Sequence, residues 1–342
     1  MNGQPTLSVV IPTRGRADVL RHTLDALLRQ TLDLSCAEIL VVVDGDDPAT
    51  CALVHALADG APCPLVALSQ RRQGPAIARN TGIARASGRV VLMLDDDITA
   101  SRTLLAAHVR HHAGRDDAMV VGPLPMERIE NEPAHHRLTR RWWDEEIREV
   151  LSPWHRPVFR DFVTGNVSVV RERLCDTGGF DADFTGYGRE DYELGYRLLQ
   201  AGLHFVFEPD AAGLHRYRKP VGEWLRQFES MAQADVIFAR KHPEITGAIM
   251  NLSPFPVIRW NPGAVAAGEA LVGHLNQRGG LAWKKAAGYV NASYYWHGIR
   301  TAVRDRAELG SLLRARLAAR SRTGNLGFKG MLYLKRAQWG LR

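Results

Sequence analysis

The chain has 342 residues, enough for one large or two ordinary domains, and 45% of them are apolar and 24% charged. That balance is typical of a soluble globular protein and excludes wholesale disorder, collagen-like repeats and a bundle of membrane helices. The formal net charge is +7, but residues 304–342 alone carry ten Lys or Arg and only two Asp or Glu. The rest of the chain is close to neutral, which argues against a nucleic-acid-binding body.

Short apolar runs alternate with helical patterns through the first hundred residues. Strands are predicted at 7–11, 37–43, 64–68 and 89–94, and a helical pattern follows each of the first three. This rhythm is typical of a doubly wound, mostly parallel α/β sheet. Thr13, Asp44 and Asp95 stand just after three of the strands, at the edge where open α/β sheets bind ligands.

The pattern becomes mixed from about residue 120 to residue 215. We predict strands at 161–170 and 205–208, and an amphipathic helix at 190–201 that ends at Gly202. From about residue 221 onward the pattern is mostly helical, with interruptions at prolines and glycines. The sequence therefore predicts an α/β region followed by an appended helical region.

Three adjacent carboxylates, Asp95, Asp96 and Asp97, follow the buried strand at 89–94. They repel one another unless a cation or hydrogen-bond donors compensate. Carboxylates suit Mg²⁺ or Mn²⁺, and such an ion could hold a diphosphate and stabilise the charge on a departing phosphate. The alternative is a solvated acidic turn that caps the next helix. The position after a buried strand favours a metal site.

Two further signals are weak when taken alone. Glu190 and Asp191 follow Tyr187-Gly188-Arg189 and open the amphipathic helix at 190–201. A carboxylate there could act as an ionised base, or it could simply cap the helix dipole. His215 follows the strand at 205–208, and a lone histidine is usually structural. It becomes a ligand candidate only if the fold carries it back toward Asp97.

Seven motifs, taken in order, resemble the inverting family 2 glycosyltransferases of the GT-A fold, over roughly residues 7–218. The motifs are Pro12-Thr13-Arg14, Val43-Asp44-Gly45-Asp46-Asp47, Ala78-Arg79-Asn80-Thr81-Gly82, Asp95-Asp96-Asp97, Thr164-Gly165-Asn166, Gly178-Gly179-Phe180-Asp181 and Glu190-Asp191. The resemblance implies a nucleotide-diphospho-sugar transferase fold with a C-terminal helical region. It implies a catalytic domain at 1–220, with a nucleotide-sugar half at 1–120 and an acceptor half at 121–220. The helical region with its basic tail would then occupy 221–342.

The same resemblance implies roles for individual residues. The nucleotide-sugar pocket would be lined by Pro12, Thr13, Arg14, Asp44, Asp46, Arg79, Asp95, Asp96, Gly165 and Asn166. Arg79 could instead be structural. The metal, Mn²⁺ or Mg²⁺, would be held by Asp97, Asp95 and His215. Asp191 would be the general base, and Glu190 would support it or hold acceptor hydroxyls.

The activity implied by the resemblance is inverting transfer of a sugar from a nucleoside-diphosphate donor to an acceptor hydroxyl. UDP is the commonest base choice, and the acceptor would be a saccharide or a lipid-linked molecule in polysaccharide, glycolipid or other glycoconjugate assembly. Asp191 would take the proton of the hydroxyl as it attacks C1 from the opposite face. The family's polymerising synthases usually add a QxxRW motif after the ED pair. This chain has none, which argues against a processive polymer synthase.

Three other functions are alternatives to this one. A nicotinamide-dependent oxidoreductase would want GxGxxG after the first strand, where this chain has one glycine, Gly15. A nucleotidyltransferase, or another metal-dependent nucleotide-sugar enzyme, could share the sheet and its acidic strand end. It would release pyrophosphate, whereas glycosyl transfer releases a nucleoside diphosphate. A non-catalytic binding module would not need the full set of carboxylates.

The remaining observations concern location. No secretory signal, transmembrane stretch or CxxC spacing is evident in the sequence, so we expect buried free thiols and a cytoplasmic protein. We expect no nucleic-acid partner. A leucine stripe among arginines within 304–342 predicts a basic amphipathic helix. That helix either packs on the catalytic domain or makes a peripheral contact with the inner face of the cell membrane.

Overall fold

The structure is a computed structural model that describes residues 6–250 and 260–323. The chain divides into two compact units, described separately below. Unit 1 comprises Met1–Ile129, Thr139–Thr185 and Glu190–Arg218, and unit 2 comprises Glu130–Leu138, Gly186–Arg189 and Lys219–Arg342. The assignment of a donor half and an acceptor half within residues 1–220 stays a prediction.

Unit 1 is built on a seven-stranded sheet with the order β3-β2-β1-β4-β7-β6-β8. Its strands are β1 (Leu7–Thr13), β2 (Ala37–Asp44), β3 (Leu65–Gln70), β4 (Val90–Leu94), β6 (Ala118–Val121), β7 (Asn166–Val170) and β8 (His204–Phe207). All neighbouring strands are parallel except β7, which is antiparallel to both β4 and β6. The predicted mostly parallel sheet is confirmed, with one reversed strand.

A second, two-stranded sheet joins segments that are far apart in the sequence. Strand β5 (Ile98–Ala100) pairs antiparallel with β9 (Gly213–His215), and Ile98 lies opposite His215. Periodicity does not predict this pair, because strands of three residues are too short to show an alternating pattern. Its consequence is that His215 lies beside the residues that directly follow Asp97.

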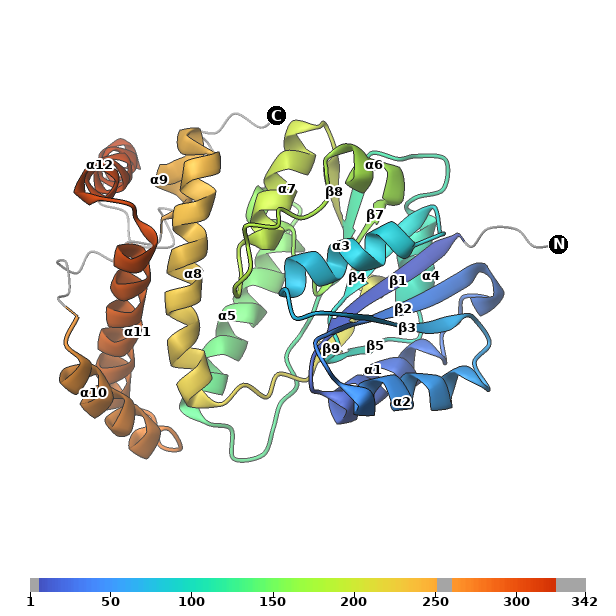
Figure 1. Cartoon of the computed structure of the whole chain (residues 1–342), viewed down its shortest axis with the longest axis horizontal. Coiled ribbons are helices and arrows are strands. Elements are labelled where there is room, and N and C mark those ends of the chain that lie inside the picture. The colour runs from blue at the N-terminus through green and yellow to red at the C-terminus, as the bar shows by residue number, and fades with distance from the viewer. Residues whose placement is uncertain (1–5, 251–259, 324–342) are drawn as a thin grey trace. The chain divides into compact units, whose positions relative to one another are not determined.

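The helices of unit 1 cover both faces of the large sheet (Figure 1). They are α1 (Ala17–Leu27), α2 (Pro48–Ala58), α3 (Pro75–Arg85), α4 (Leu104–Arg110), α6 (Arg171–Asp176) and α7 (Glu190–Gln200). Most of α5 (Ala134–Val150) also belongs to unit 1, but it does not pack on the sheet (Figure 1). Short 3₁₀ helices lie at Leu34–Cys36, Phe159–Asp161 and Pro209–Ala211.

The strand predicted at 161–170 was wrong in its first half, since β7 begins at Asn166. Asp161 instead closes a 3₁₀ turn, because its carboxylate accepts hydrogen bonds from Val158 N and His155 Nε2, both at 2.7 Å. A side chain that satisfies nearby polar groups in this way competes with strand formation.

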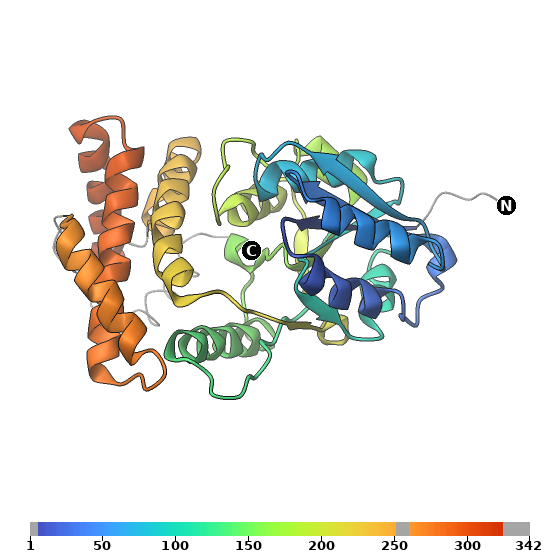
Figure 2. The ribbon, with the colours of Figure 1, turned by 60° about the horizontal axis from the view of Figure 1, so that its bottom comes forward.

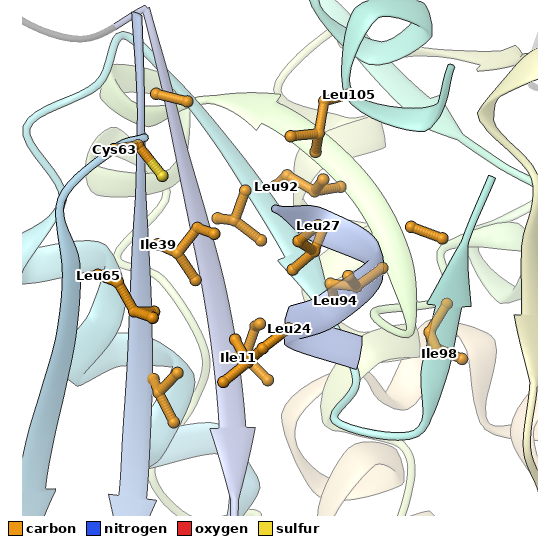
Figure 3. Packing of buried hydrophobic residues seen from close by; sticks show 14 of the residues in the cluster. Ile11, Leu24, Leu27, Ile39, Cys63, Leu65, Leu92, Leu94, Ile98 and Leu105 are labelled. Atoms are coloured by element: carbon orange, nitrogen blue, oxygen red, sulfur yellow. The ribbon is translucent and has the colours of Figure 1, made fainter. Parts of the chain in front are cut away.

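Alternation along the strands separates the core of unit 1 into two layers. Val9 and Ile11 of β1 pack in the cluster that contains the leucines of α1, whereas Val10 packs in the cluster of α3 and α7. Figure 3 shows the first layer, with Leu24 and Leu27 against Ile11 and Leu92. Strands buried on both faces are expected in parallel sheets. The packing fixes the strands, and therefore fixes where their carboxyl ends meet.

Unit 2 is helical, as the sequence predicted for the C-terminal region. Its helices are α8 (Val221–Lys241), α9 (Thr246–Ile249), α10 (Pro262–Leu275), α11 (Leu281–Ala302) and α12 (Arg306–Thr323), with a 3₁₀ helix at Pro243–Ile245. Helices α8 and α11 lie side by side in both Figure 1 and Figure 2, and Trp224 stacks on Trp283 with ring centroids 6.0 Å apart. Residues 324–342 of the predicted basic tail lie outside the described residues.

Two expectations about location can be compared with the structure. Within residues 6–250 and 260–323, no helix combines the length and the apolar character needed to cross a bilayer. The four cysteines are free, but only Cys63 is buried, and burial raises the pKa of its thiol to about 11. The prediction that all four thiols are buried was therefore wrong, since Cys175 is exposed and the other two are half-buried.

Candidate active site at the carboxyl edge of the sheet

Asp95, Asp96 and Asp97 follow β4 directly and occupy three different environments. Asp96 is fully buried, Asp97 is 8% exposed, and the side chain of Asp95 is 35% exposed. Each carboxylate meets a different set of partners. The repulsion expected among three adjacent carboxylates is therefore relieved one residue at a time.

Asp96 anchors the end of β1 to the end of β4. Its carboxylate accepts a hydrogen bond from Thr13 Oγ1 at 2.6 Å and forms an ion pair with the guanidinium of Arg16, while Thr23 Oγ1 donates to its carbonyl oxygen at 2.7 Å. Burial raises the pKa of Asp96 to about 6, although Arg16 opposes the shift. We expected Asp96 to line the nucleotide-sugar pocket. The structure corrects this expectation, because the carboxylate faces inward onto Thr13 and Arg16.

Asp97 and His215 form a pair. The distance from His215 Nε2 to Asp97 Oδ1 is 3.4 Å, and Arg16 Nη1 donates to the other carboxylate oxygen at 3.2 Å. Burial alone would raise the pKa of Asp97, but His215 and Arg16 outweigh burial and lower it. The condition set by the sequence analysis is met, since β9 carries His215 back to Asp97.

The pair has properties that suit a divalent cation. Asp97 Oδ1 and His215 Nδ1 are buried and make no hydrogen bond. A carboxylate together with an imidazole fits a first-row ion such as Mn²⁺ better than Mg²⁺, which prefers oxygen ligands. The described residues contain no group of three or more His, Cys, Asp or Glu side chains arranged to hold a metal ion. The structure brings together two of the three predicted ligands, and Asp95 is not with them.

Asp95 is instead linked to the ED pair through Arg79 of α3. The buried guanidinium donates from Nη2 to Asp95 Oδ1 at 2.8 Å and from Nη1 to Glu190 Oε1 at 3.0 Å. Burial lowers the pKa of Arg79, but Asp95 and Glu190 outweigh burial and raise it. This geometry favours the structural alternative for Arg79, because both terminal nitrogens are used within the protein.

Close packing of α3 on β1 brings Arg79 to this position. A Cβ atom at Gly82 would lie 2.2 Å from a methyl carbon of Val10, so only glycine fits there. Arg79 lies about one turn before Gly82 on the same helix. The ring of Phe180 lies 5.6 Å from the guanidinium carbon and covers it.

The ED pair opens α7, and its two residues differ in access. Glu190 is buried, and its Oε2 atom has no hydrogen bond. Asp191 is half-buried, and its Oδ1 atom accepts a hydrogen bond from Tyr192 N at 2.8 Å. The N-terminal end of a helix favours a negative charge. Of the two, Asp191 is the carboxylate that solvent or a ligand can reach.

The residues that we predicted to bind the nucleotide-sugar donor after β1 and β2 differ in their exposure to solvent. Asp44 is buried and accepts hydrogen bonds from Gln70 Nε2, Gln73 N and Gly74 N, so it fixes the loop before α3. Pro12 is half-buried, whereas Arg14 and Asp46 are exposed. The structure thus leaves Arg14 and Asp46 accessible at this edge, and uses Asp44 to hold its loop.

The prediction for Thr164-Gly165-Asn166 needs a correction. Asn166 is fully buried, its Nδ2 donates to Ala211 O at 2.7 Å, and its Oδ1 lies 2.9 Å from His108 Nε2. Both polar atoms of its side-chain amide therefore have partners inside the protein, and no part of Asn166 is exposed to line a donor pocket. Gly165 does lie at the site, because a Cβ there would sit 3.2 Å from Asp95 Oδ2.

Two residues that the sequence analysis did not select contribute to the site. Arg16 pairs with Asp96 and Asp97, and Asp47 links the loops after β1 and β2 by accepting from Gly15 N at 2.8 Å and from Thr50. A run of three carboxylates needs a nearby cation, and Arg16 follows the strand that neighbours β4. The sequence signal was only the need of the three carboxylates for a cation, because the adjacency of the two strands is known from the structure alone.

Comparison with known families gives two matches along the chain. A model described as glycosyl transferase family 2 matches residues 8–174, and one described as the N-terminal domain of galactosyltransferase matches residues 148–220. The chain belongs to glycosyl transferase family 2. The first match covers the loops after β1 and β2, Arg79 and the three carboxylates after β4. The second covers the ED pair and His215.

Curated relatives of this family 2 member are about 30% identical to it over the aligned residues. The chain is 32% identical over 264 residues to a validoxylamine A glucosyltransferase from Streptomyces hygroscopicus subsp. jinggangensis, a match that covers 70% of this chain and 62% of the relative. It is 29% identical over 247 residues to a pre-mycofactocin glycosyltransferase from Mycobacterium tuberculosis, covering 71% of this chain and 50% of the relative. The chain therefore matches only half to three fifths of these relatives' length.

Solved structures agree on the fold. A mannosyltransferase from Pyrobaculum calidifontis, PcManGT, solved with GDP-Man and Mn²⁺, aligns over 98% of this chain and 80% of its own, with a TM-score of 0.55 and 19% identity. TarS 1–349 from S. aureus aligns over 86% of this chain and 90% of its own, with a TM-score of 0.51 and 14% identity. At these identities the likeness concerns the GT-A type fold.

Proposed function

We propose that this family 2 member is an inverting glycosyltransferase, which moves a sugar from a nucleoside-diphosphate donor to an acceptor hydroxyl. The observation that carries the proposal is the arrangement around β4. One buried arginine, Arg79, contacts both Asp95 and Glu190, while Asp97 lies beside His215. The three carboxylates after β4 are therefore tied on one side to His215, through Asp97, and on the other side to the ED pair, through Asp95 and Arg79.

In this proposal Asp191 is the general base. Its half-buried carboxylate lies at the start of α7, and a carboxylate in this place can take a proton from an acceptor hydroxyl. Glu190 acts differently, because Arg79 holds one of its oxygens while Oε2 stays available to accept a hydrogen bond from the acceptor. Attack from the face opposite the leaving group would invert the anomeric centre.

Asp97 and His215 are the residues that would hold a divalent cation, for which Mn²⁺ is the better fit. When bound, such an ion supplies positive charge to the departing diphosphate. Arg16 supports the site by holding Asp96 and one oxygen of Asp97, so that the other oxygen faces His215. Exposed Arg14 and Asp46 are the donor-pocket residues that this arrangement leaves free to contact a nucleotide.

The names of the relatives support the reaction class. The relatives from Streptomyces and Mycobacterium are named as a glucosyltransferase and a glycosyltransferase, and the Pyrobaculum mannosyltransferase was solved with a nucleotide-sugar and Mn²⁺. For this chain we propose a UDP-sugar donor and a saccharide or lipid-linked acceptor, since UDP is the commonest donor base in such enzymes. A thermal-shift comparison of UDP, GDP and dTDP with Mn²⁺ tests the base, because a specific ligand stabilises the folded state.

The deciding experiment replaces the base. Asp191→Asn should lower the rate of transfer by about 10²–10⁴-fold, which is the usual worth of general-base catalysis, and leave nucleotide binding near that of the wild type. The matched control is Asp117→Asn. It removes an exposed carboxylate just before β6, away from the candidate site. Turnover of Asp191→Asn close to that of the control would refute the assignment.

Product analysis separates the proposal from nucleotidyl transfer. Release of a nucleoside diphosphate, with inversion at C1 of the sugar, supports glycosyl transfer. Release of pyrophosphate would refute it. We further propose a cytoplasmic protein that meets the membrane through the positive charge of residues 304–342, because clusters of Lys and Arg attract anionic lipid. The apolar side of α12 is not available for this contact, since Leu312 packs in a core cluster of unit 2. Flotation on anionic liposomes with and without residues 304–342 tests this, and equal flotation of the two forms would refute it.

A further inference from the structure

Arg189, the residue directly before the ED pair, has an unusual backbone. Its φ angle is +78°, in the left-handed region, where among the described non-glycine residues it is joined only by Asn131. Asparagine tolerates this region, whereas a long side chain enters it only when surrounding contacts hold it there. Glycine would adopt the same angle without strain. An arginine at this position therefore indicates that contacts of its side chain hold the backbone in this conformation.

The side chain of Arg189 forms an ion pair with a buried carboxylate, Asp235, within unit 2. Its Nε donates to Asp235 Oδ1 at 2.6 Å and its Nη2 donates to Oδ2 at 3.5 Å, and Asp235 has no exposed surface. Tyr295 of α11 also donates to Asp235 Oδ2. Charge-assisted contacts to both oxygens fix direction as well as distance. The carboxylate on α8 thus holds Arg189 from one side and is itself held by α11.

The neighbouring residues belong to the same anchored segment. Lys219 Nζ lies 3.9 Å from the ring centre of Tyr187, and residues 186–189 group with unit 2. The next residue, Glu190, is the first residue of α7 and of the following stretch of unit 1. The peptide bond between Arg189 and Glu190 therefore connects an anchored segment directly to the ED pair.

We propose that Arg189 and Asp235 are a positioning pair that sets the direction in which the chain enters α7, and so sets where the Asp191 carboxylate lies. This inference rests on the proposed function, in which Asp191 is the base. Neither residue touches a reacting group; each acts through the backbone. A displacement of about 1 Å at a reacting group can cost on the order of 100-fold in rate, so an anchor two residues from the base has a large effect.

The test uses the full chain and two variants that break the pair from opposite sides. Arg189→Gly keeps the left-handed angle but removes the anchor, and Asp235→Asn keeps the shape but removes the buried charge. We expect kcat to fall about 10- to 100-fold in both, with the KM for the donor within twofold of the wild type. Arg189→Lys, which keeps one charged donor, should recover part of the loss.

A matched control lies on the same helix. Arg240 of α8 forms an ion pair with Glu308, which belongs to α12 and has no link to residues 186–189. Arg240→Ala should leave kcat unchanged even if it lowers the melting temperature. If Arg189→Gly and Arg240→Ala have the same kcat, Arg189 is only a structural contact and the inference is overturned.

A second readout separates this inference from the proposed function. Hydrogen exchange of the amides of residues 190–197 should be at least tenfold faster in Arg189→Gly than in the wild type and unchanged in Arg240→Ala. If the wild type transfers no sugar, the proposed function fails, yet faster exchange still supports the anchor. Unchanged exchange in Arg189→Gly overturns the positioning role, whatever the activity.

Discussion

The two ends of the seven-stranded sheet hold buried carboxylates in different ways. At the start of the strands, Glu38 accepts hydrogen bonds from Ser8 Oγ at 2.5 Å and from Ser87 N and Oγ at 2.7 Å. Burial would raise the pKa of Glu38, but these hydrogen bonds outweigh burial and lower it. At the carboxyl end, arginines pair with Asp97 and Glu190, and one oxygen of each, Asp97 Oδ1 and Glu190 Oε2, is buried without a hydrogen bond.

The difference teaches how to separate a structural acid from a working one. Nearly all buried polar atoms in folded proteins have a hydrogen-bond partner, so an acceptor without one marks a place where a ligand is expected. Glu38 is satisfied by neutral groups of its own unit. Asp97 and Glu190 are only half satisfied, by cations that leave one oxygen open. Both ends carry buried charge, but of these three carboxylates only Asp97 and Glu190 have a buried oxygen without a hydrogen bond.

Neutralising the carboxylate of Asp97, in the candidate metal pair, should have the largest effect. Asp97→Asn takes away the charge that would hold a divalent cation, which is worth several kcal/mol of transition-state stabilisation, and transfer should fall by about 10³-fold. Thermal shift with Mn²⁺ should lose its concentration dependence in the same variant. A rate within tenfold of the wild type would mean that Asp97 and His215 are a structural pair like Glu38.

Breaking the buried arginine comes next. Arg79→Met leaves Glu190 buried without its cation, so the free energy of unfolding should fall by about 3–5 kcal/mol. Urea unfolding measures this. The matched control is Arg115→Met, which breaks an exposed ion pair with Asp117 and should cost less than about 1 kcal/mol. Equal losses in the two variants would contradict the account of the site.

The opposite end should show the reverse behaviour. Glu38→Gln keeps the shape but removes the charge that strengthens the hydrogen bonds from Ser8 and Ser87, and should lower the free energy of unfolding by about 1.5 kcal/mol. Because Glu38 lies at the end of the strands opposite the candidate site, kcat should stay at the wild-type value. Loss of turnover at unchanged stability would remove the distinction between the two ends.

A buried histidine offers a smaller, pH-dependent test of a fully satisfied group. His108 has both ring nitrogens at 2.9 Å from partners, on Ser168 and Asn166, and burial lowers its pKa to about 4. Below the unfolded pKa of about 6.5, the unfolded chain takes up a proton that the folded chain refuses. The free energy of unfolding should therefore fall between pH 6.5 and pH 4, by up to about 1.4 kcal/mol per pH unit. Urea unfolding of His108→Gln should show a flatter profile, and an identical slope would exclude His108 as its source.

The sequence predicted the parts of this architecture that depend on local patterns. The four opening strands, the helix that starts at Glu190 and the helical C-terminal region follow from apolar periodicity and from glycine positions. The three carboxylates after β4 were recognisable because they stand where a buried strand ends. His215 could be a ligand only if the fold brings it to Asp97, and the pairing of β5 with β9 does so.

The parts that could not be predicted depend on which segments become neighbours. Arg16 meets Asp96 only because β1 and β4 are adjacent in the sheet. Asn166 resembles a ligand-binding residue by its motif, yet His108 and Ala211 take up its amide. Periodicity reports the face of a strand and not its neighbour, so contacts across the sheet escape it.

The pairing of β5 with β9 also determines when, during synthesis of the chain, Asp97 and His215 can come together. During synthesis Asp97 emerges from the ribosome long before His215, and a three-residue strand such as β5 has no stability without its partner. A nascent chain that ends before Gly213 holds the three carboxylates but lacks the imidazole beside them. Capture of a cation at this pair would then be reserved for chains that have finished folding unit 1, since ligand sets of this kind do not exist in the unfolded state.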